Sequence, residues 1–220
     1  MRPYRPPTKP YLAVVYADES LLVLDKPCGL LSVPGRDPAH RDSLASRAQA
    51  EYPGALIVHR LDMDTSGLVV MARDPEAHRK LSALFQNRLV EKKYLAKVWG
   101  EPEAETGEID LPLICDWPNR PRQKVDYEVG KPSLTHWKKI AAARNCSLME
   151  LQPVTGRSHQ LRVHLQAIGH PILGDPFYAH PQALAAAPRL LLHAAELTLN
   201  HPESRKRMHF TSAPDESLLQ

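Results

Sequence analysis

The sequence has few features that could cross-link the chain or anchor it to a membrane. Its 220 residues include only three cysteines, Cys28, Cys115 and Cys146, which lie far apart and form no C-x-x-C pair. An odd number of isolated cysteines argues against a disulfide framework and against a zinc knuckle. A chain of this length can bury an adequate core without either. A reducing cytosol fits this cysteine usage best.

Long hydrophobic runs are also absent. The longest apolar run near the N-terminus, residues 11–16, is followed at once by Asp18 and Glu19. A signal peptide needs an apolar core of about 7 to 15 residues, and a membrane-spanning helix needs about 20. The G-x-G-x-x-G and G-x-x-x-x-G-K patterns do not occur, which disfavours nucleotide-cofactor folds. We therefore expect a cytoplasmic protein with no membrane contact.

Neither sign of charge is in large excess, but the basic residues are clustered. Lysine and arginine number 28 against 25 acidic residues, a formal net charge of +3. Residues 73–97 contain seven basic and three acidic side chains, and a Pro-rich segment carries Arg120, Arg122 and Lys124. A solvated helix face and a charged loop would explain both clusters. A surface that follows phosphates is the alternative.

The order of patterns along the chain predicts a mixed α/β fold with a substantially antiparallel sheet. Residues 1–10 contain four prolines and should form an extended arm, residues 11–210 a single domain, and residues 211–220 a polar tail. Helices are expected at 43–52, from Pro75 to about Phe85, and at 161–168. Strands are expected at 11–16, 21–25, 55–58, 68–72, 92–99, 134–143, 146–152, 190–199 and 207–210.

A polar insert between two predicted strands contains the first candidate for chemistry. Residues 59–67 read H-R-L-D-M-D-T-S-G, with Asp62 between donors on both sides. Asp62 could be a turn former, Asp64 could be the important carboxylate, or the two could form an acid and base dyad of the glycosidase kind. Gly67 would allow another backbone to approach closely.

The second candidate is the segment G-R-S-H-Q-L-R at residues 156–162, where a loop enters a helix. Free backbone N–H groups beside Arg157 and Arg162 would make an anion site, although simple capping by Ser158 would also explain the pattern. His159 and His164 are five residues apart, which is poor spacing for two metal ligands on a helix, so we expect no metal site.

Three ordered motifs resemble those of the RluA-type pseudouridine synthases. They are HRLD and TSG at residues 59–67, KKYLA at 92–96, and GRSHQLRVH at 156–164. The resemblance covers about residues 11 to 210. The segment at 113–121, the short length and the lack of an N-terminal S4-type RNA-binding domain resemble the dual-specificity branch of that family.

This resemblance implies isomerisation of uridine to pseudouridine in RNA, on a mixed α+β fold with a long, bent, largely antiparallel sheet flanked by helices. The uridines implied are position 32 of a tRNA anticodon loop and position 746 of a 23S rRNA hairpin. The uracil leaves C1′ through N1 and returns through C5, so no cofactor or metal is required. The absence of heptads makes a monomer the default expectation.

The resemblance also assigns roles to residues. The catalytic candidates are Asp62, Tyr94 and Arg162, with Asp62 acting as a nucleophile at C1′ or as a base at the neighbouring ribose carbon. Arg162 would pair with Asp62, and Tyr94 would stack on the uracil. Arg60 would fill the space left by a flipped-out uridine. Further substrate contacts are expected from His59, Thr65, Arg157, His159 and Gln160.

Other function classes use parts of this pattern. A non-catalytic RNA-binding module would explain the basic clusters but not the combination of Asp62, Tyr94 and Arg162. A glycosidase or nucleobase glycosylase also places a carboxylate near an anomeric carbon, but it releases a free sugar or base. A member of the same family that acts on other 23S rRNA or tRNA uridines is the nearest alternative.

Overall fold

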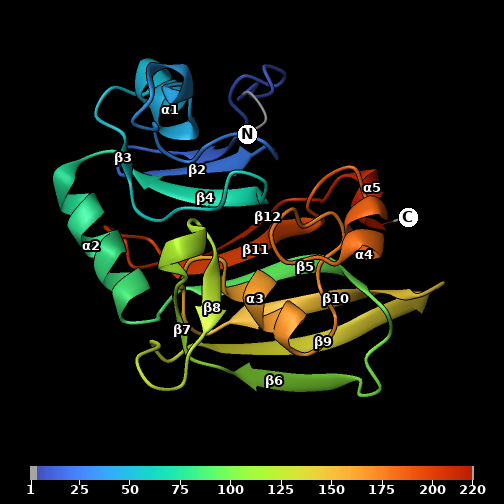
Figure 1. Ribbon diagram of the computed structural model, residues 1–220. Coiled ribbons are helices and arrows are strands. Elements are labelled where there is room, and N and C mark those ends of the chain that lie inside the picture. Colours follow the sequence, from blue (N-terminus) through green and yellow to red (C-terminus); the bar gives the residue numbers. More distant parts are fainter. Residues whose placement is uncertain (1–3, 220) are drawn as a thin grey trace. The chain divides into compact units, whose positions relative to one another are not determined.

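The computed structural model describes residues 4–219 of the chain (Figure 1). These residues form two compact units. The single catalytic domain at residues 11–210 stays a prediction. Unit 1 consists of Met1–Lys92 and Ala194–Ala213, and unit 2 of Lys93–His193 and Pro214–Gln220. Each unit is built from two separate stretches of the chain, and each has its own hydrophobic cluster.

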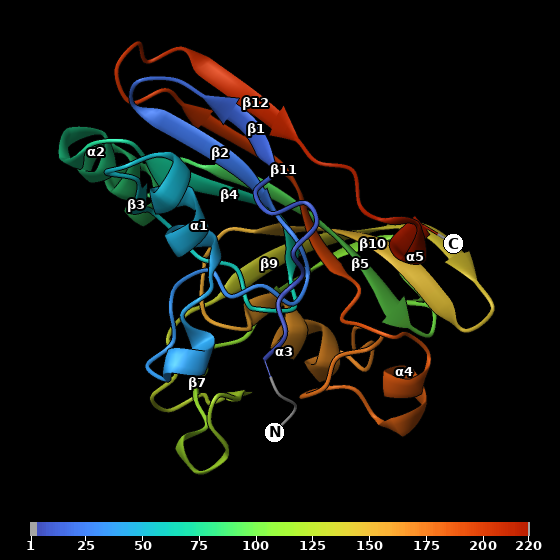
Figure 2. The ribbon, with the colours of Figure 1, turned by 90° about the horizontal axis from the view of Figure 1, so that it is seen from above.

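Unit 1 contains a sheet in which the strand order is β1-β2-β4-β11-β12, and β3 pairs with β4. The pairs β1–β2, β2–β4, β3–β4 and β11–β12 are antiparallel. Figure 2 shows these strands running beside one another. The strands are β1 (Val14–Ala17), β2 (Leu21–Lys26), β3 (Leu56–Ile57), β4 (Ser66–Ala72), β11 (Leu192–Asn200) and β12 (Arg207–Thr211).

The helices of unit 1 begin where the sequence predicts. In α1 (Leu44–Glu51), the Ser43 and Ser46 side chains form a reciprocal capping box. In α2 (Pro75–Gln86), the Asp74 side chain accepts hydrogen bonds from the backbone N–H groups of the first turn. The predicted apolar stripe of α2 packs into the unit 1 core with strand residues such as Val70. A short 3-10 helix, η1 (Pro38–His40), precedes α1.

The sheet of unit 2 has the strand order β5-β10-β9-β6, and a separate hairpin pairs β7 with β8. The β5–β10, β10–β9, β9–β6 and β7–β8 pairs are antiparallel. The strands are β5 (Glu91–Trp99), β6 (Thr106–Asp110), β7 (Leu113–Cys115), β8 (Gln123–Val125), β9 (Leu134–Ala143) and β10 (Cys146–Pro153). The sequence patterns did not predict β6, β7 or β8. Strand β9 has the predicted bounds.

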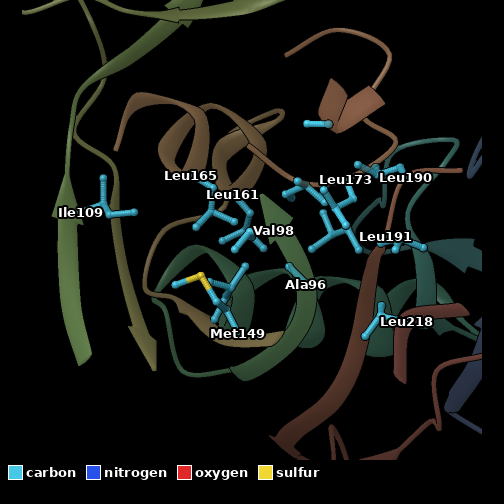
Figure 3. Packing of buried hydrophobic residues seen from close by; sticks show 14 residues of the cluster. Ala96, Val98, Ile109, Met149, Leu161, Leu165, Leu173, Leu190, Leu191 and Leu218 are labelled. Atoms are coloured by element: carbon cyan, nitrogen blue, oxygen red, sulfur yellow. The ribbon is translucent and has the colours of Figure 1, made fainter. Parts of the chain in front are cut away.

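The helices of unit 2 are α3 (Gln160–Ala167), α4 (Pro181–Ala185) and α5 (Glu216–Leu219), and a 3-10 turn, η2 (Trp117–Asn119), lies in the β7–β8 hairpin. Figure 3 shows the unit 2 core, in which Leu161 and Leu165 of α3 pack near Val98 of β5. Gly169, at φ +86°, follows α3 and lets the chain leave the helix in the left-handed conformation.

The C-terminal segment differs from the polar tail predicted for 211–220. Thr211 ends β12, and residues 216–219 form α5. Leu218 is buried in the unit 2 core, so an apolar side chain helps to fix this segment. Of the predicted arm at 1–10, residues 1–3 lie outside the described residues. The rest has no helix or strand, but the Tyr4 hydroxyl donates to the Asp42 carbonyl and accepts from the Leu31 N–H.

The structure confirms the predicted mixed α+β class, with a large sheet and few helices. In the part of the chain described here, none of the helices combines the length and the apolar character needed to cross a membrane.

Candidate active site

Asp62 lies in unit 1, in a tight turn that leads into β4. The backbone N–H of Thr65 donates to the Asp62 carbonyl at 3.2 Å and closes the turn, and the Asp62 side chain is half-buried. Gly67 follows at φ +108°, and a side chain there would overlap the backbone of Ala194 in β11. The predicted close backbone approach is therefore present, and it fixes the strand that carries the turn.

A buried lysine holds the same turn from inside. Lys26, at the end of β2, is 0% exposed, and its ammonium group donates to the carbonyls of Pro27, Leu30 and Met63 at 3.0, 2.7 and 2.8 Å. Met63 directly follows Asp62. Burial lowers the pKa of Lys26 to about 8, and the negative charges of nearby groups, Asp62 and Asp64 among them, offset only part of that effect.

His59 and Arg60 precede the turn and have different environments. The His59 ring stacks on Phe85 at 4.4 Å, and its Nε2 accepts a hydrogen bond from the Val70 N–H at 3.0 Å. Burial, assisted by the charge of Lys92, lowers the pKa of His59 to about 3, so the ring is neutral at pH 7 with its proton on Nδ1. The Arg60 side chain is exposed, as its predicted role requires.

Thr65 is only 2% exposed, so its side chain lies inside unit 1. Its burial and its part in closing the turn give Thr65 a structural role, and the predicted substrate contact stays a prediction. The sequence could not distinguish these roles, since a threonine beside an aspartate satisfies either one.

Tyr94 lies in unit 2, on β5, opposite Leu151 of β10. It is half-buried, and its ring packs against the unit 2 core, which includes Ala96 and Val98 of the same strand face. The predicted alternation along this strand is therefore confirmed. A tyrosine on a buried sheet face has a firmly oriented ring, which suits it for stacking on a planar base.

Arg162 lies in the first turn of α3 and is 3% exposed. Its Nε and Nη2 atoms donate to the two carboxylate oxygens of Asp175 at 2.8 and 2.7 Å, a bidentate pair in which Asp175 is fully buried. The Asp175 carboxylate also accepts from the N–H groups of Phe177 and Tyr178 at 2.9 and 3.3 Å. This pair uses two of the five N–H donors of the guanidinium group and fixes its plane.

Gln160 uses its whole side-chain amide inside the protein. Its Oε1 accepts from the Thr155 hydroxyl at 2.7 Å and from the Arg157 N–H at 3.0 Å. Its Nε2 donates to the Leu134 carbonyl and the Thr135 hydroxyl, both at 3.0 Å. Because all four hydrogen-bonding positions are satisfied, Gln160 holds the loop before α3. The predicted substrate contact of Gln160 stays a prediction.

His159 occupies the N-cap position of α3 at φ 53°, without a side-chain cap, so the alternative of capping by Ser158 is wrong. Its Nδ1 is 2.7 Å from the Tyr178 hydroxyl, which also accepts from the Gln123 N–H at 2.8 Å. Arg157 is exposed beside this loop, whereas Arg162 is turned inward to Asp175. Of the two guanidinium groups expected at an anion site, only that of Arg157 faces solvent.

His164 is buried in unit 2, where its ring nitrogens lie 3.0 Å from the Thr135 hydroxyl and 3.1 Å from the Leu111 carbonyl. Burial is the main influence on its pKa, which is lowered. His164 is therefore a core residue of α3. Within residues 4–219, no three or more His, Cys, Asp or Glu side chains are grouped closely enough to hold a metal ion.

The structure assigns the predicted site residues to two groups. Unit 1 carries His59, Arg60, Asp62 and Thr65 within one segment. Unit 2 carries Tyr94, Arg157, His159, Gln160 and Arg162. Sequence reasoning did not assign roles to Lys26, Asp175 or Tyr178, which hold these segments. Lys26 lies beside Pro27, and Asp175 lies beside Gly174, within the stretch that the family resemblance covers. That resemblance was the only sequence signal that could have pointed to these two residues.

Chemically, unit 1 offers the Asp62 carboxylate in a rigid turn that also contains Asp64, with a neutral imidazole and an exposed guanidinium group close in sequence. Unit 2 offers an oriented phenol and an immobilised guanidinium group. The carboxylate of unit 1 is a group that can act as a nucleophile or as a general base.

Comparison with known proteins identifies relatives of the whole chain. The family model described as RNA pseudouridylate synthase matches residues 20–167. The dual-specificity RNA pseudouridine synthases RluA of Salmonella typhi and of Escherichia coli (strain K12) are each 54% identical to this chain over 216 residues, covering 98% of it and 99% of the relative. The RluA of Vibrio vulnificus is 54% identical over 209 residues and covers 93% of this chain and 84% of the relative.

Two solved structures resemble the fold. Human RNA pseudouridylate synthase domain containing 1 matches with a TM-score of 0.76 at 30% identity, covering 93% of this chain and 83% of that one. Human RNA pseudouridylate synthase domain containing 4 matches with a TM-score of 0.76 at 26% identity, covering 94% of this chain and 90% of that one.

Proposed function

Since this chain belongs to the RNA pseudouridylate synthase family and isomerises uridine to pseudouridine in RNA, we propose that it has two substrates, tRNA and 23S rRNA. The uridines are position 32 of the anticodon loop and position 746 of an rRNA hairpin, as its motifs imply. The single observation that carries the proposal is the 54% identity, over nearly the whole of both chains, to synthases named for dual specificity.

Asp62 begins the reaction in this proposal. The bond from C1′ to N1 must break, the uracil must turn, and a bond from C1′ to C5 must form with loss of the C5 proton. A single carboxylate is sufficient, either as a nucleophile at C1′ or as a base at the neighbouring ribose carbon. The turn that Lys26 and Gly67 hold in place supports this role, because it keeps the carboxylate in one geometry.

Tyr94 and Arg162 complete the catalytic set. Tyr94 stacks on the uracil and retains the detached base, and its hydroxyl assists removal of the C5 proton. Arg162, fixed by Asp175, is the positioning charge for the catalytic carboxylate. Water must be excluded during the rotation, because hydrolysis would otherwise release the base.

Substrate binding begins with base flipping, which costs a few kcal/mol and is least costly in a loop. Arg60 is exposed, and we assign it the space that the flipped uridine leaves. Arg157 contacts a phosphate, and His159 supports it from the start of α3. The protein acts as a monomer in the cytoplasm, where its proposed substrates are found.

Nucleoside analysis of defined RNAs tests the proposal. The purified protein is incubated with unmodified tRNA and with a 23S rRNA fragment, and the pseudouridine in each is mapped and counted. One new pseudouridine is expected in each RNA, at the named position, with no free uracil. Modification of one RNA only contradicts dual specificity, and free uracil would indicate a glycosylase instead.

A further inference from the structure

An exposed tryptophan stands at the tip of the β7–β8 hairpin in unit 2. Trp117 is 66% exposed, and the guanidinium carbon of Arg120 lies 4.5 Å from the centre of its ring. A large aromatic side chain that remains in solvent is unusual, and tryptophan and arginine are among the residues enriched at binding surfaces. Nothing in the proposed catalytic steps uses this pair.

Hydrogen bonds hold the hairpin tip in one shape. The N–H of Asp116 donates to the Arg122 carbonyl at 2.9 Å, and the N–H of Arg122 donates to the Asn119 carbonyl at 3.1 Å. The Asn119 N–H and side-chain amide both donate to Asp116, each at 2.9 Å. The tip is therefore preorganised, which lowers the entropic cost of binding a partner.

The charges at the tip favour a polyanion. In the described residues, no carboxylate lies within ion-pair distance of Arg120 or Arg122, whereas the neighbouring Lys124 pairs with Asp126 at 3.2 Å. Both arginines stand over aromatic rings instead, Arg120 over Trp117 and Arg122 over Phe177 at 5.9 Å. An arginine on an aromatic ring presents a flat, charged surface that suits nucleotide bases and phosphates.

The hairpin is also fixed to the segment that holds Arg162. The Gln123 N–H of β8 donates to the Tyr178 hydroxyl, and the rings of Phe177 and Tyr178 each lie 5.2 Å from the Arg162 guanidinium carbon. A nucleic acid strand that reaches the Arg162 side of unit 2 would therefore meet the hairpin nearby, in a fixed position.

We propose that Trp117, Arg120 and Arg122 form a stacking surface for unpaired nucleotides of the RNA substrate, outside the uridine that is isomerised. The proposal rests on the proposed function for the identity of the RNA. Unpaired bases stack on aromatic rings and guanidinium planes with little dependence on sequence. Such contacts suit an enzyme that, as proposed, accepts unpaired loops of two RNAs.

The first test measures binding without turnover. A labelled tRNA anticodon stem-loop is titrated with protein in an Asp62→Asn background, and the dissociation constant is read by fluorescence anisotropy. Trp117→Ala is expected to weaken binding about tenfold or more, and Trp117→Phe to restore most of it. Ile140→Ala, which changes an exposed apolar residue of β9, is the matched control and should stay within about twofold of its parent.

The second test uses the otherwise native enzyme. Trp117→Ala should raise KM by a similar factor while kcat at saturating RNA stays unchanged, because the stacking surface does not touch the reacting atoms. Arg120→Ala should act in the same direction, and Arg120→Lys should recover it only in part, because lysine lacks the planar group.

Three results would overturn the proposal. One is unchanged RNA binding by Trp117→Ala, which would leave the hairpin for a protein partner. Another is an equal loss of binding to a fully paired duplex, which would point to phosphate contact instead of stacking. The third is a lower kcat with unchanged KM. The binding test gives its result even if the wild-type protein forms no pseudouridine, so failure of the proposed function would be seen separately.

Discussion

The two units bury a positive charge in different ways. In unit 1 the ammonium group of Lys26 is surrounded by three neutral carbonyl oxygens, and burial lowers its pKa to about 8. In unit 2 the guanidinium group of Arg162 is held by a buried carboxylate that accepts two of its N–H bonds. Both cations support a segment that carries a catalytic candidate. Carbonyl oxygens can therefore hold a buried cation in place, whereas a matched carboxylate also compensates its charge.

The largest expected effect comes from removing the carboxylate of Asp175. Asp175→Asn keeps the side-chain volume but withdraws the charge that balances Arg162 in the interior. We expect the free energy of unfolding, measured by urea titration, to fall by about 3 to 5 kcal/mol.

An exposed arginine–carboxylate pair with similar distances is the control for this change. Arg207 and Glu91 form a pair at 2.8 and 2.9 Å with both side chains about two-thirds exposed. Glu91→Gln should cost less than about 1 kcal/mol. Equal losses for Asp175→Asn and Glu91→Gln would show that burial does not set the strength of the Arg162 pair.

The second prediction concerns the pH dependence of stability in unit 1. The pKa of Lys26 is about 8 in the folded protein and about 10.4 in the unfolded chain, so the unfolded chain binds more protons between these values. Stability contributed by this residue should therefore rise with pH from about 8 to about 10.4, by up to roughly 3 kcal/mol.

Lys26→Met isolates that contribution, because it removes the titrating group and leaves the others unchanged. The urea midpoints of both proteins should diverge between pH 7 and 10. The midpoint of the wild type should rise relative to that of the variant as the pH rises. Parallel curves would contradict the lowered pKa. No matching window is expected from Arg162, since arginine stays protonated throughout this range.

The smallest predicted effect concerns the hydroxyl group of Tyr178 in unit 2. Tyr178→Phe removes the hydroxyl that links Gln123 and His159 but keeps the ring over Arg162. We expect a loss of about 1 kcal/mol in unfolding free energy, typical of a hydrogen-bonded hydroxyl. A loss as large as that of Asp175→Asn would show that the hydroxyl, and not the carboxylate, is the main support of this segment.

The elements that could be predicted from the sequence are those whose signals are local. Asp74 and Pro75 mark the start of α2, and the apolar spacing after them defines its buried face. The division into two units could not be predicted, because β11 and β12 belong mainly to unit 1 although about one hundred residues of unit 2 precede them in the chain. No local sequence pattern indicates a contact between segments so far apart.

The same limit applies to the candidate site. Family motifs identify Asp62, Tyr94 and Arg162 as residue types in order, but the roles of Thr65 and Gln160 depend on burial and on partners elsewhere. Gln160 bonds to Leu134 and Thr135, which lie about 25 residues earlier in the chain. The motif therefore predicts a substrate contact for Gln160, whereas its supporting role is visible only in the fold.

In the proposed reaction, Asp62 alone supplies the carboxylate for uridine isomerisation in both RNAs. The most direct test is tritium release from tRNA and 23S rRNA carrying 5-tritiated uridine, with the wild-type protein and with Asp62→Asn. We expect the wild type to release tritium from both RNAs. The Asp62→Asn variant should release none from either RNA, although it still binds them. Release by Asp62→Asn at a rate near that of the wild type would contradict it.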